Sequence, residues 1–475
     1  MRYVSTRGDA PPVRFNELLL SGLAPDGGLY VPEAWPVFEE DEIRALSGLP
    51  YTEVVRRIIS PYIGDTIAPD VLDRIVIGAY QDFDHAGIAP LRQLSSNEWL
   101  LELFHGPTLA FKDYALQLLG RLIEHSRALK GEHITIVGAT SGDTGSAAID
   151  ACRGLDRVDA FILHPKDRVS EVQRRQMTTV TEANIHNIAV EGTFDDCQAM
   201  VKAMFNERAF SESFGLTAVN SINWARVMAQ IVYYFYAAVA LGAPDRQFTF
   251  VVPTGNFGDV YAGYAAYRMG LPVSRLVVAT NRNDILTRFF ESAEYRKDVV
   301  HPTISPSMDI QVSSNFERLL FESLGRDGAA IASYMSELDT NGGFRVGDDC
   351  HAALRQLFSA RAVSEDETLA SMAAMSRDYD LLIDPHTAVG ISAARAVRDE
   401  YADGSTPVIV LATAHPAKFP DAVEQATGAR PALPPHISDL YDREERYDVL
   451  PNDVVAIQDY IRERISVGQV RGLAT

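Results

Sequence analysis

The sequence predicts an α/β protein with two parallel-sheet α/β domains that carry helices on both faces, preceded by a mostly helical N-terminal domain. The first observation is a regular alternation of short apolar strands and longer amphipathic helices from about residue 98 onward. Strands joined through helices pair in parallel and bury both faces of their sheet. The second observation is that apolar residues before this point recur mainly at helical spacing.

The N-terminal cap domain is expected to cover residues 1–95. Its helices are predicted by amphipathic stretches at 15–20, 40–46 and 52–62, with a Gly27-Gly28 turn between them. The α/β region, residues 96–420, then begins with a strand at 99–103. In the helix that follows, one apolar face is formed by Leu116, Leu119, Leu122 and Ile123.

The α/β region is expected to contain two subdomains. The smaller one, at about 130–215, is predicted to have strands at 134–138, 159–163 and 185–190 and helices at 144–152, 169–180 and 194–210. The larger one is predicted to continue with helix 223–241, strand 248–252, helix 260–269 and strand 275–280. This order is typical of repeated strand–helix–strand units.

The C-terminal part of the sequence is less regular. Residues 282–345 are interrupted by Pro302 and Pro306, and we interpret them as an insertion near the site. Residues 351–400 are predicted to be helical apart from a strand at 381–383, and another strand is predicted at 408–411. Residues 421–475 are expected to form a peripheral helical tail.

Composition limits the possible partners. The 475 residues carry a formal net charge of -21, which argues against binding to nucleic acid or to an anionic membrane surface. The longest apolar run, 231–243, is too short to span a bilayer. The three cysteines, Cys152, Cys197 and Cys350, show no paired spacing, and the first residues lack the apolar segment of a signal peptide. We therefore expect a cytoplasmic protein that acts on small molecules.

Lys112 is the candidate catalytic residue. It ends the apolar, turn-rich stretch His105-Gly106-Pro107-Thr108-Leu109-Ala110-Phe111 and stands at the start of a predicted helix. An apolar setting disfavours an ammonium ion, and a neutral amine can form a Schiff base with an aldehyde cofactor. The alternative is an ordinary solvated lysine. Phe111 places an aromatic ring beside the amine, which favours the catalytic interpretation.

The stretch from His105 to Asp113 resembles the lysine attachment segment of the threonine synthase family, within the fold-type II pyridoxal-phosphate enzymes. Other segments carry the same resemblance in the same order. They are LAPDGGLYVP at 23–32, SGDTG at 141–145, GNFGD at 255–259, PSMDI at 306–310 followed by SSNFE at 313–317, DPHTAVG at 384–390 and ATAHP at 412–416. The resemblance therefore covers essentially the whole chain.

This resemblance implies a fold-type II architecture with pyridoxal 5'-phosphate bound to Lys112, in which the smaller subdomain is mobile. It also implies a lyase that converts O-phospho-L-homoserine and water to L-threonine and phosphate, the last step of threonine biosynthesis. One alternative is a serine or threonine dehydratase of the same fold, which needs no second phosphate site. Another is a non-catalytic homologue that binds phosphorylated small molecules. The oligomeric state, monomer or homodimer, stays open.

The loop Gly255-Asn256-Phe257-Gly258-Asp259 follows a predicted strand and precedes a helix. Two glycines allow the backbone to approach a phosphate closely, and successive amides can point toward it. The alternative is a simple capping turn. The resemblance implies that this loop holds the cofactor phosphate, although Asp259 would repel it and is expected to bond backbone or water.

Thr413 follows the strand at 408–411. The resemblance implies that its hydroxyl meets the cofactor's pyridine nitrogen, whereas the alternative is a buried threonine that bonds the backbone. Eleven histidines are present, but none has the spacing of an HExxH metal motif, and no GxSxG sequence occurs. Metal catalysis and acyl transfer are therefore not supported.

The loop Ser141-Gly142-Asp143-Thr144-Gly145 offers hydroxyls and amides at a second helix start. Taken alone, it reads as a helix cap. The resemblance implies that it binds the substrate carboxylate, close to the substrate phosphate. The segment at 220–226 has a similar resemblance and could supply Asn223 and Arg226 to a phosphate.

Overall fold

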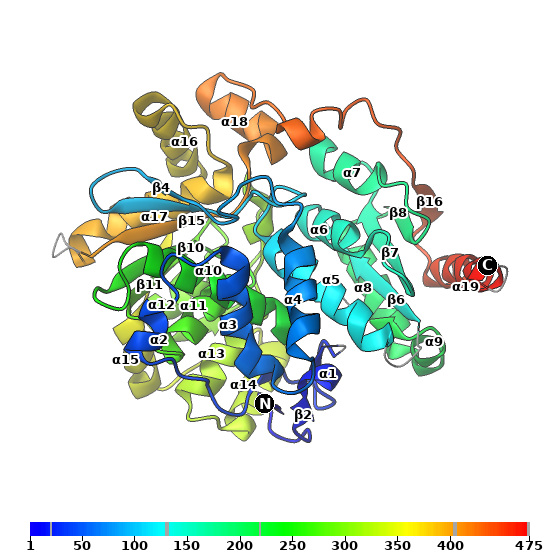
Figure 1. Cartoon of the computed structure of the whole chain (residues 1–475), viewed down its shortest axis with the longest axis horizontal. Coiled ribbons are helices and arrows are strands. Elements are labelled where there is room, and N and C mark those ends of the chain that lie inside the picture. Colours follow the sequence, from blue (N-terminus) through cyan, green and yellow to red (C-terminus); the bar gives the residue numbers. More distant parts are fainter. Residues whose placement is uncertain (20, 129–132, 218–219, 402–405, 473–475) are drawn as a thin grey trace. The chain divides into compact units, whose positions relative to one another are not determined.

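The computed structural model describes residues 1–19, 21–128, 133–217, 220–401 and 406–472. The chain divides into two compact units (Figure 1). Unit 1 comprises Met1–Leu19, Leu23–Ala115 and Ser221–Leu433, and unit 2 comprises Leu20–Gly22, Leu116–Asn220 and Pro434–Thr475. The boundary near residue 115 falls within helix α5 (Lys112–Ala128), so this helix starts in unit 1 and continues in unit 2.

The N-terminal part of unit 1 contains a small antiparallel sheet that the helical pattern did not predict. Its strands are β1 (Arg2–Ser5), β2 (Val13–Arg14) and β3 (Tyr30–Pro32), in the order β2-β1-β3. The helices of this part are α1 (Phe15–Leu18), α2 (Glu40–Arg44), α3 (Tyr51–Ile63) and α4 (Pro69–Tyr80). Each of these strands has at most four residues, which is too short to show a clear alternation of apolar and polar positions.

A six-stranded sheet forms the centre of unit 1, in the order β14-β11-β10-β15-β5-β4. Its strands are β4 (Leu91–Gln93), β5 (Glu98–Glu102), β10 (Phe248–Pro253), β11 (Val273–Thr280), β14 (Phe358–Ala362) and β15 (Val408–Ala412). All pairs are parallel except β4 with β5. β10 is buried along its whole length, as expected for a central parallel strand.

The helices of unit 1 that follow residue 220 are α10 to α18. They are α10 (Trp224–Ala240), α11 (Gly258–Arg268), α12 (Ile285–Ser292), α13 (Phe316–Ser323), α14 (Gly328–Asn341), α15 (Asp348–Leu357), α16 (Glu365–Tyr379), α17 (Pro385–Tyr401) and α18 (Pro420–Thr427). A two-stranded antiparallel sheet is formed by β12 (Glu294–Arg296) and β13 (Gly343–Arg345), and Pro306–Met308 forms a 3-10 turn.

Two predictions in this region are wrong. Residues 381–383 form no strand but connect α16 to α17, where Ile383 is buried in an apolar cluster with Val389 and Val410. The segment Phe358–Ala362, predicted to be helical, is strand β14 at the sheet edge. Short apolar runs do not distinguish a strand from a buried connection, and an edge strand lacks a continuous apolar run.

Unit 2 contains a parallel five-stranded sheet in the order β16-β8-β7-β6-β9. Its strands are β6 (Ile134–Ala139), β7 (Val158–Pro165), β8 (Ile185–Glu191), β9 (Leu216–Thr217) and β16 (Asp448–Pro451). Its helices after α5 are α6 (Asp143–Cys152), α7 (Glu171–Thr178), α8 (Phe194–Asn206), α9 (Arg208–Ser213) and α19 (Val454–Gly472).

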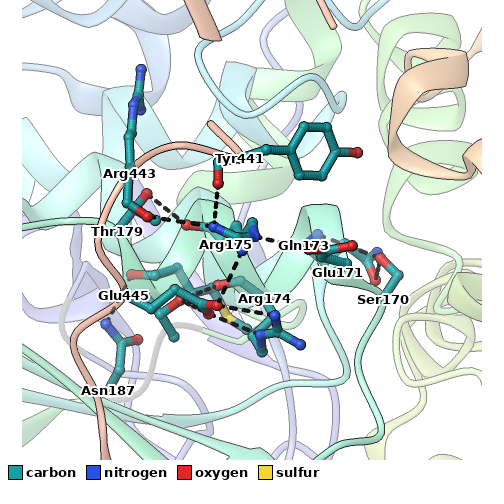
Figure 2. Close-up of polar contacts among 12 residues, drawn as sticks. Ser170, Glu171, Gln173, Arg174, Arg175, Thr179, Asn187, Tyr441, Arg443 and Glu445 are labelled. Atoms are coloured by element: carbon teal, nitrogen blue, oxygen red, sulfur yellow. Dashed lines mark hydrogen bonds and ion pairs between the residues drawn. The ribbon is translucent and has the colours of Figure 1, made fainter. Parts of the chain in front are cut away.

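The C-terminal segment contributes to the core of unit 2. β16 pairs with β8, and Ile457 and Ile461 of α19 pack in the apolar cluster of the sheet. Figure 2 shows how the preceding loop is fixed to α7. There Glu445 accepts hydrogen bonds of 2.8 and 3.0 Å from Arg174, and Arg175 donates to the carbonyl of Tyr441. This segment therefore differs from the peripheral helical tail expected from the sequence. No helix among the described residues is long and apolar enough to cross a membrane.

Candidate active site

The turn before Lys112 is closed by Asp113. One carboxylate oxygen of Asp113 accepts from the Thr108 amide at 2.8 Å, and the other accepts from the Thr108 hydroxyl at 2.6 Å. Gly106 lies against this carboxyl group, because a Cβ built at Gly106 would be 2.5 Å from the Asp113 Cβ. Leu109 has a positive φ of 64°, which completes the reversal of the chain. The HGPTLAFKD sequence thus folds into a tight turn that presents Lys112 at the start of α5.

The Lys112 amine is buried in unit 1. The residue is 8% exposed, and its Nζ donates to the hydroxyl of Ser307 at 3.4 Å. Nζ also lies 5.3 Å from the ring centroid of Phe111, as the sequence suggested. The Lys112 amine is therefore largely shielded from water, beside an aromatic ring and a hydroxyl.

The ATAHP segment runs beside the attachment turn. The Phe111 amide donates to the carbonyl of Thr413 at 2.9 Å, and the His415 amide donates to the carbonyl of Leu109 at 3.0 Å. Thr413 is buried, and its hydroxyl forms no hydrogen bond with another described residue. The structure therefore brings Thr413 next to the residue that precedes Lys112, with a hydroxyl that is available for a ligand.

The GNFGD loop lies between β10 and α11. The amides of Gly255, Asn256 and Phe257 donate to no acceptor in the described part of the chain. Phe257 has a φ of 61°, and its side chain is buried against the rings of Phe316 and Phe358. Phe257 thus anchors the loop in the core while the loop amides, together with the start of α11, stay available for an anion.

Neighbouring segments hold this loop in place. The Ser313 hydroxyl donates to the Gly255 carbonyl at 2.6 Å, and the Asn315 side chain and amide both donate to the Asn256 carbonyl. A Cβ at Gly255 would lie 2.6 Å from the carbonyl oxygen of Ser307. Only glycine permits this approach between the loop and the segment that contacts Lys112.

The Asp259 carboxyl is buried and is bonded to α10. Its Oδ1 accepts from the Tyr233 hydroxyl at 2.6 Å and from the Tyr234 hydroxyl at 2.9 Å. Two tyrosines of α10 therefore replace the backbone or water partner that the sequence suggested. Burial raises the pKa of the Asp259 carboxyl to about 7, and the two tyrosine hydroxyls partly offset this rise.

Asn223 and Arg226 at the start of α10 have different surroundings. The Asn223 side chain accepts from the Ala225 amide and donates to the Leu19 carbonyl, so it caps α10. Arg226 is fully enclosed, and its Nε and Nη1 have no hydrogen-bond partner among the described residues. Burial lowers the pKa of the Arg226 guanidinium to about 10. A buried cation with free donors is a candidate anion ligand.

The SGDTG loop belongs to unit 2. The hydroxyl of Thr140 accepts from the amides of Gly142 and Gly145, and the Asp143 carboxylate accepts from the Gln173 side chain at 2.7 Å. Asp143, Gly142 and Gly145 therefore form hydrogen bonds that stabilise the conformation of the loop. The hydroxyls of Ser141, which is exposed, and Thr144, which is half-buried, form no hydrogen bond with another described residue and are available to a ligand.

Sequence reasoning missed several residues that shape the site. Thr140 and Gln173 organise the SGDTG loop, and no motif marked them. Ser307 and His386 lie within the PSMDI and DPHTAVG segments, but a role for either side chain was not inferred. Lys418, two residues beyond ATAHP, is fully buried and donates to the Thr108 carbonyl at 2.6 Å.

The residues of unit 1 fit pyridoxal phosphate. A buried amine, a glycine-rich loop with available amides and an uncharged hydroxyl at the end of a parallel strand match the aldehyde, the phosphate and the ring nitrogen in chemical type. Among the described residues, no group of three or more His, Cys, Asp or Glu side chains is arranged to bind a metal.

Three family models match consecutive parts of the chain. The model described as threonine synthase N terminus matches residues 2–80, the model described as pyridoxal-phosphate dependent enzyme matches residues 83–360, and the model described as threonine synthase, C-terminal matches residues 387–461. Together these models span most of both units.

Individual relatives agree with the family models. The chain is 56% identical to the threonine synthase of Pseudomonas aeruginosa over 470 residues, which is 99% of this chain and 100% of the relative. It is similar to the crystal structure of PLP-bound threonine synthase from Brucella melitensis, with a TM-score of 0.95, 52% identity and coverage of 98% and 99% of the two chains. For the yeast threonine synthase structure the TM-score is 0.93, with 39% identity and coverage of 98% and 99%.

Proposed function

The chain belongs to the threonine synthase family of pyridoxal-phosphate-dependent enzymes, and from this premise we propose which of its residues carry the reaction. The reaction is the conversion of O-phospho-L-homoserine and water to L-threonine and phosphate. The observation that carries the proposal is the buried Lys112 amine, which contacts Ser307 and follows the residue whose amide is bonded to Thr413. This lysine resembles an amine set for covalent chemistry, because it is shielded from water.

Lys112 is assigned two roles. It holds the cofactor covalently, and after the substrate amine has replaced it, the free amine moves protons at Cα and Cβ of the substrate. Lys112 stands in the first turn of α5, and the Asp113–Thr108 hydrogen bonds fix the backbone turn that precedes it. When bound, pyridoxal phosphate supplies the electron sink that stabilises negative charge at the substrate carbon.

The GNFGD loop is assigned the cofactor phosphate. The available amides of Gly255, Asn256 and Phe257 support this assignment, and Gly258 continues the loop at the N-terminus of α11. Asp259 contributes indirectly, because its bonds to Tyr233 and Tyr234 fix the start of α11. Thr413 is assigned to the pyridine nitrogen, which an uncharged hydroxyl can meet without favouring its protonation.

The substrate requires two further anion contacts. Arg226 is assigned to the substrate phosphate, because its buried guanidinium offers two nitrogens without described partners. Asn223 supports it by capping the helix that carries it. Ser141 and Thr144 are assigned to the substrate carboxylate, and Gly142, Asp143 and Gly145 shape their loop.

The cytoplasm is the proposed location. The three cysteines are free thiols, and two of them, Cys152 and Cys197, are buried. Burial raises the pKa of the Cys152 thiol to about 12 and that of the Cys197 thiol to about 11, which keeps both protonated and unreactive. Such thiols suit a reducing compartment.

One experiment tests the function directly. The purified chain with pyridoxal phosphate is incubated with O-phospho-L-homoserine, and inorganic phosphate and threonine are measured together. Equal amounts of both products are expected. In parallel, serine and threonine are supplied as substrates and 2-oxo acids are measured. If serine or threonine yields 2-oxo acids and phosphohomoserine yields no threonine, the result supports a dehydratase. If phosphohomoserine binds and no product forms from any of these substrates, the result supports a binding homologue.

A further inference from the structure

The Lys112 amine is the end of a chain of hydrogen bonds that lies wholly within unit 1. Nζ of Lys112 donates to the Ser307 hydroxyl at 3.4 Å. The Ser307 amide donates to Nε2 of His386 at 3.2 Å, and Nδ1 of His386 lies 2.7 Å from Oδ2 of Asp384. Asp384 and His386 are buried, so water does not compete for these bonds.

The partners of His386 fix its tautomer. A backbone amide is only a donor, so Nε2 must accept from Ser307 and carries no proton. Nδ1 therefore carries the proton and donates it to the Asp384 carboxylate. Asp384 in turn is held by the amides of His386 and Thr387, at 2.9 and 3.0 Å, at the start of α17. The ring of Phe419, 4.8 Å from the His386 ring centroid, packs against the imidazole.

Asp309, two residues after Ser307, fixes the loop that carries this serine. Oδ1 of Asp309 accepts from Asn281 at 2.7 Å and from Asn283 at 3.0 Å, and its Oδ2 accepts from the Thr303 amide at 2.8 Å. These bonds tie the 303–309 loop to the end of β11. Asp309 thus fixes the loop that contains Ser307, and His386 of the DPHTAVG segment bonds Ser307 itself.

We propose that His386 is a positioning residue for the reaction, which holds Ser307 so that the serine hydroxyl orients the Lys112 amine. This inference rests on the proposed role of Lys112 and extends it. A pure helix cap does not require an imidazole at this position, because Asp384 caps α17 through backbone amides alone. The imidazole of His386 contributes one contact to the site, because its Nε2 accepts the hydrogen bond from the Ser307 amide.

Two substitutions of His386 separate the acceptor from the rest of the ring. In His386→Asn, the amide nitrogen can occupy the position of Nδ1 and donate to Asp384, but no acceptor reaches Ser307. In His386→Gln, the side-chain oxygen can occupy the position of Nε2 and accept from Ser307. Ser307→Ala removes the hydroxyl and leaves its amide in place. His351→Asn is the matched control, because His351 is bonded to the Phe290 carbonyl on another part of unit 1.

For the loaded enzyme we expect His386→Asn and Ser307→Ala to lower kcat about tenfold to a hundredfold through misplacement of the amine. KM should stay within about threefold, because substrate binding is not affected. The visible absorption band of the bound cofactor should shift in both variants. The double variant should be no slower than the slower single variant, and His386→Gln should recover most of the loss.

A second measurement needs neither cofactor nor activity. In the free protein, the ¹⁵N chemical shifts of His386, assigned by their loss in His386→Asn, should show Nδ1 protonated and Nε2 unprotonated. A protonated Nε2 would overturn the proposal. The proposal would also be overturned if His386→Asn kept the kcat of the wild type and an unshifted absorption band of the bound cofactor. An equal loss of kcat in His386→Asn and His386→Gln would overturn it as well.

Borohydride reduction followed by peptide mass analysis distinguishes failure of this inference from failure of the proposed function. Cofactor trapped on Lys112 in the wild type supports the proposed function, whatever the His386 variants do. Cofactor trapped on another lysine would remove the basis of both proposals.

Discussion

The Nζ of Lys418 donates a hydrogen bond of 2.6 Å to the backbone carbonyl of Thr108, 310 positions earlier in the chain. Both residues are buried, and Lys418 has no exposed surface. The bond ties the segment after β15 to the attachment turn. It runs alongside the backbone bonds between 109–111 and 413–415, so one short region of unit 1 fixes both Lys112 and Thr413.

Lys418→Met should therefore destabilise the protein and loosen its hold on the cofactor. The Thr108 carbonyl would lose a buried donor, which costs about 1–3 kcal/mol of the free energy of unfolding. Chemical denaturation of the free protein and titration with pyridoxal phosphate measure the two effects. Lys297→Met is the control, since the side chain of Lys297 forms a long, partly exposed ion pair with Asp339 at 4.0 Å. Equal stability of the Lys418 variant and the wild type would show that this bond does not hold the turn.

Lys112→Ala should abolish the visible absorption of the bound cofactor and turnover together, because both depend on one amine. Loss of proton transfer alone commonly lowers a rate by about 10²–10⁴-fold. Absorption spectra and the coupled phosphate and threonine assay measure the two effects on one preparation. Normal turnover by this variant would contradict the assignment of Lys112.

Gly255→Ala and Gly258→Ala form a matched pair. A Cβ at Gly255 would lie 2.6 Å from the Ser307 carbonyl oxygen, whereas the nearest atom to a Cβ at Gly258 is the Asn315 side-chain nitrogen at 3.4 Å. Gly255→Ala should therefore displace the Ser307 segment, weaken cofactor binding and lower stability. Gly258→Ala meets no close protein atom, so any loss of cofactor there would come from crowding of the phosphate. Cofactor occupancy and melting temperature, measured on both variants, separate the two effects.

Asp259→Asn should change the pH dependence of stability. The pKa of the Asp259 carboxyl is raised to about 7 by burial, above its ordinary value of 3.8. Between these values the unfolded chain has released a proton that the folded chain keeps, so wild-type stability falls as pH rises through this window. The slope is at most about 1.4 kcal/mol per pH unit for one group. The Asn variant lacks this contribution, so chemical denaturation at several pH values between about 4 and about 7 should show its stability rising relative to that of the wild type. A constant difference would indicate that Asp259 is ionised throughout the window.

The parallel core of the fold was predictable because its strands are continuous apolar runs. β10 is buried at every position and was recognised from composition alone. β16 was missed, because its four residues at the sheet edge are mostly exposed and resemble a loop. Which edge it joins depends on side chains that are distant in sequence, such as the Arg174–Glu445 pair. No local pattern encodes such a pairing.

The sequence-based assignments of the site depend on local signatures and on the family resemblance together. A lysine in an apolar turn and a glycine-rich loop are recognisable locally, and the resemblance links Lys112 and the GNFGD loop to a cofactor. The contact between Lys112 and Ser307 spans 195 positions, so only the folded chain reveals it. The partners of Asp259 were likewise hidden, because Tyr233 and Tyr234 read as core residues of an apolar helix.

Thr413 provides the last prediction, because its surroundings combine a fixed backbone with an available hydroxyl. Its carbonyl accepts from the Phe111 amide, and the residue is buried at the end of β15. A hydroxyl can bond the pyridine nitrogen without favouring its protonation, whereas a carboxylate strongly stabilises the charged pyridinium. Thr413→Ser should therefore keep turnover within about threefold of wild type, and Thr413→Asp should lower it at least about tenfold, equivalent to about 1.4 kcal/mol of barrier.

The visible spectrum of the bound cofactor gives the second readout for these variants. Thr413→Asp should shift the band, and Thr413→Ser should leave it in place, because only the carboxylate changes the charge next to the ring nitrogen. Thr413→Val keeps the shape of the side chain and removes the hydroxyl, so it separates packing from hydrogen bonding. If Val and Asp are tolerated while Ser is not, Thr413 acts through its methyl group in the core, and another residue must meet the ring nitrogen.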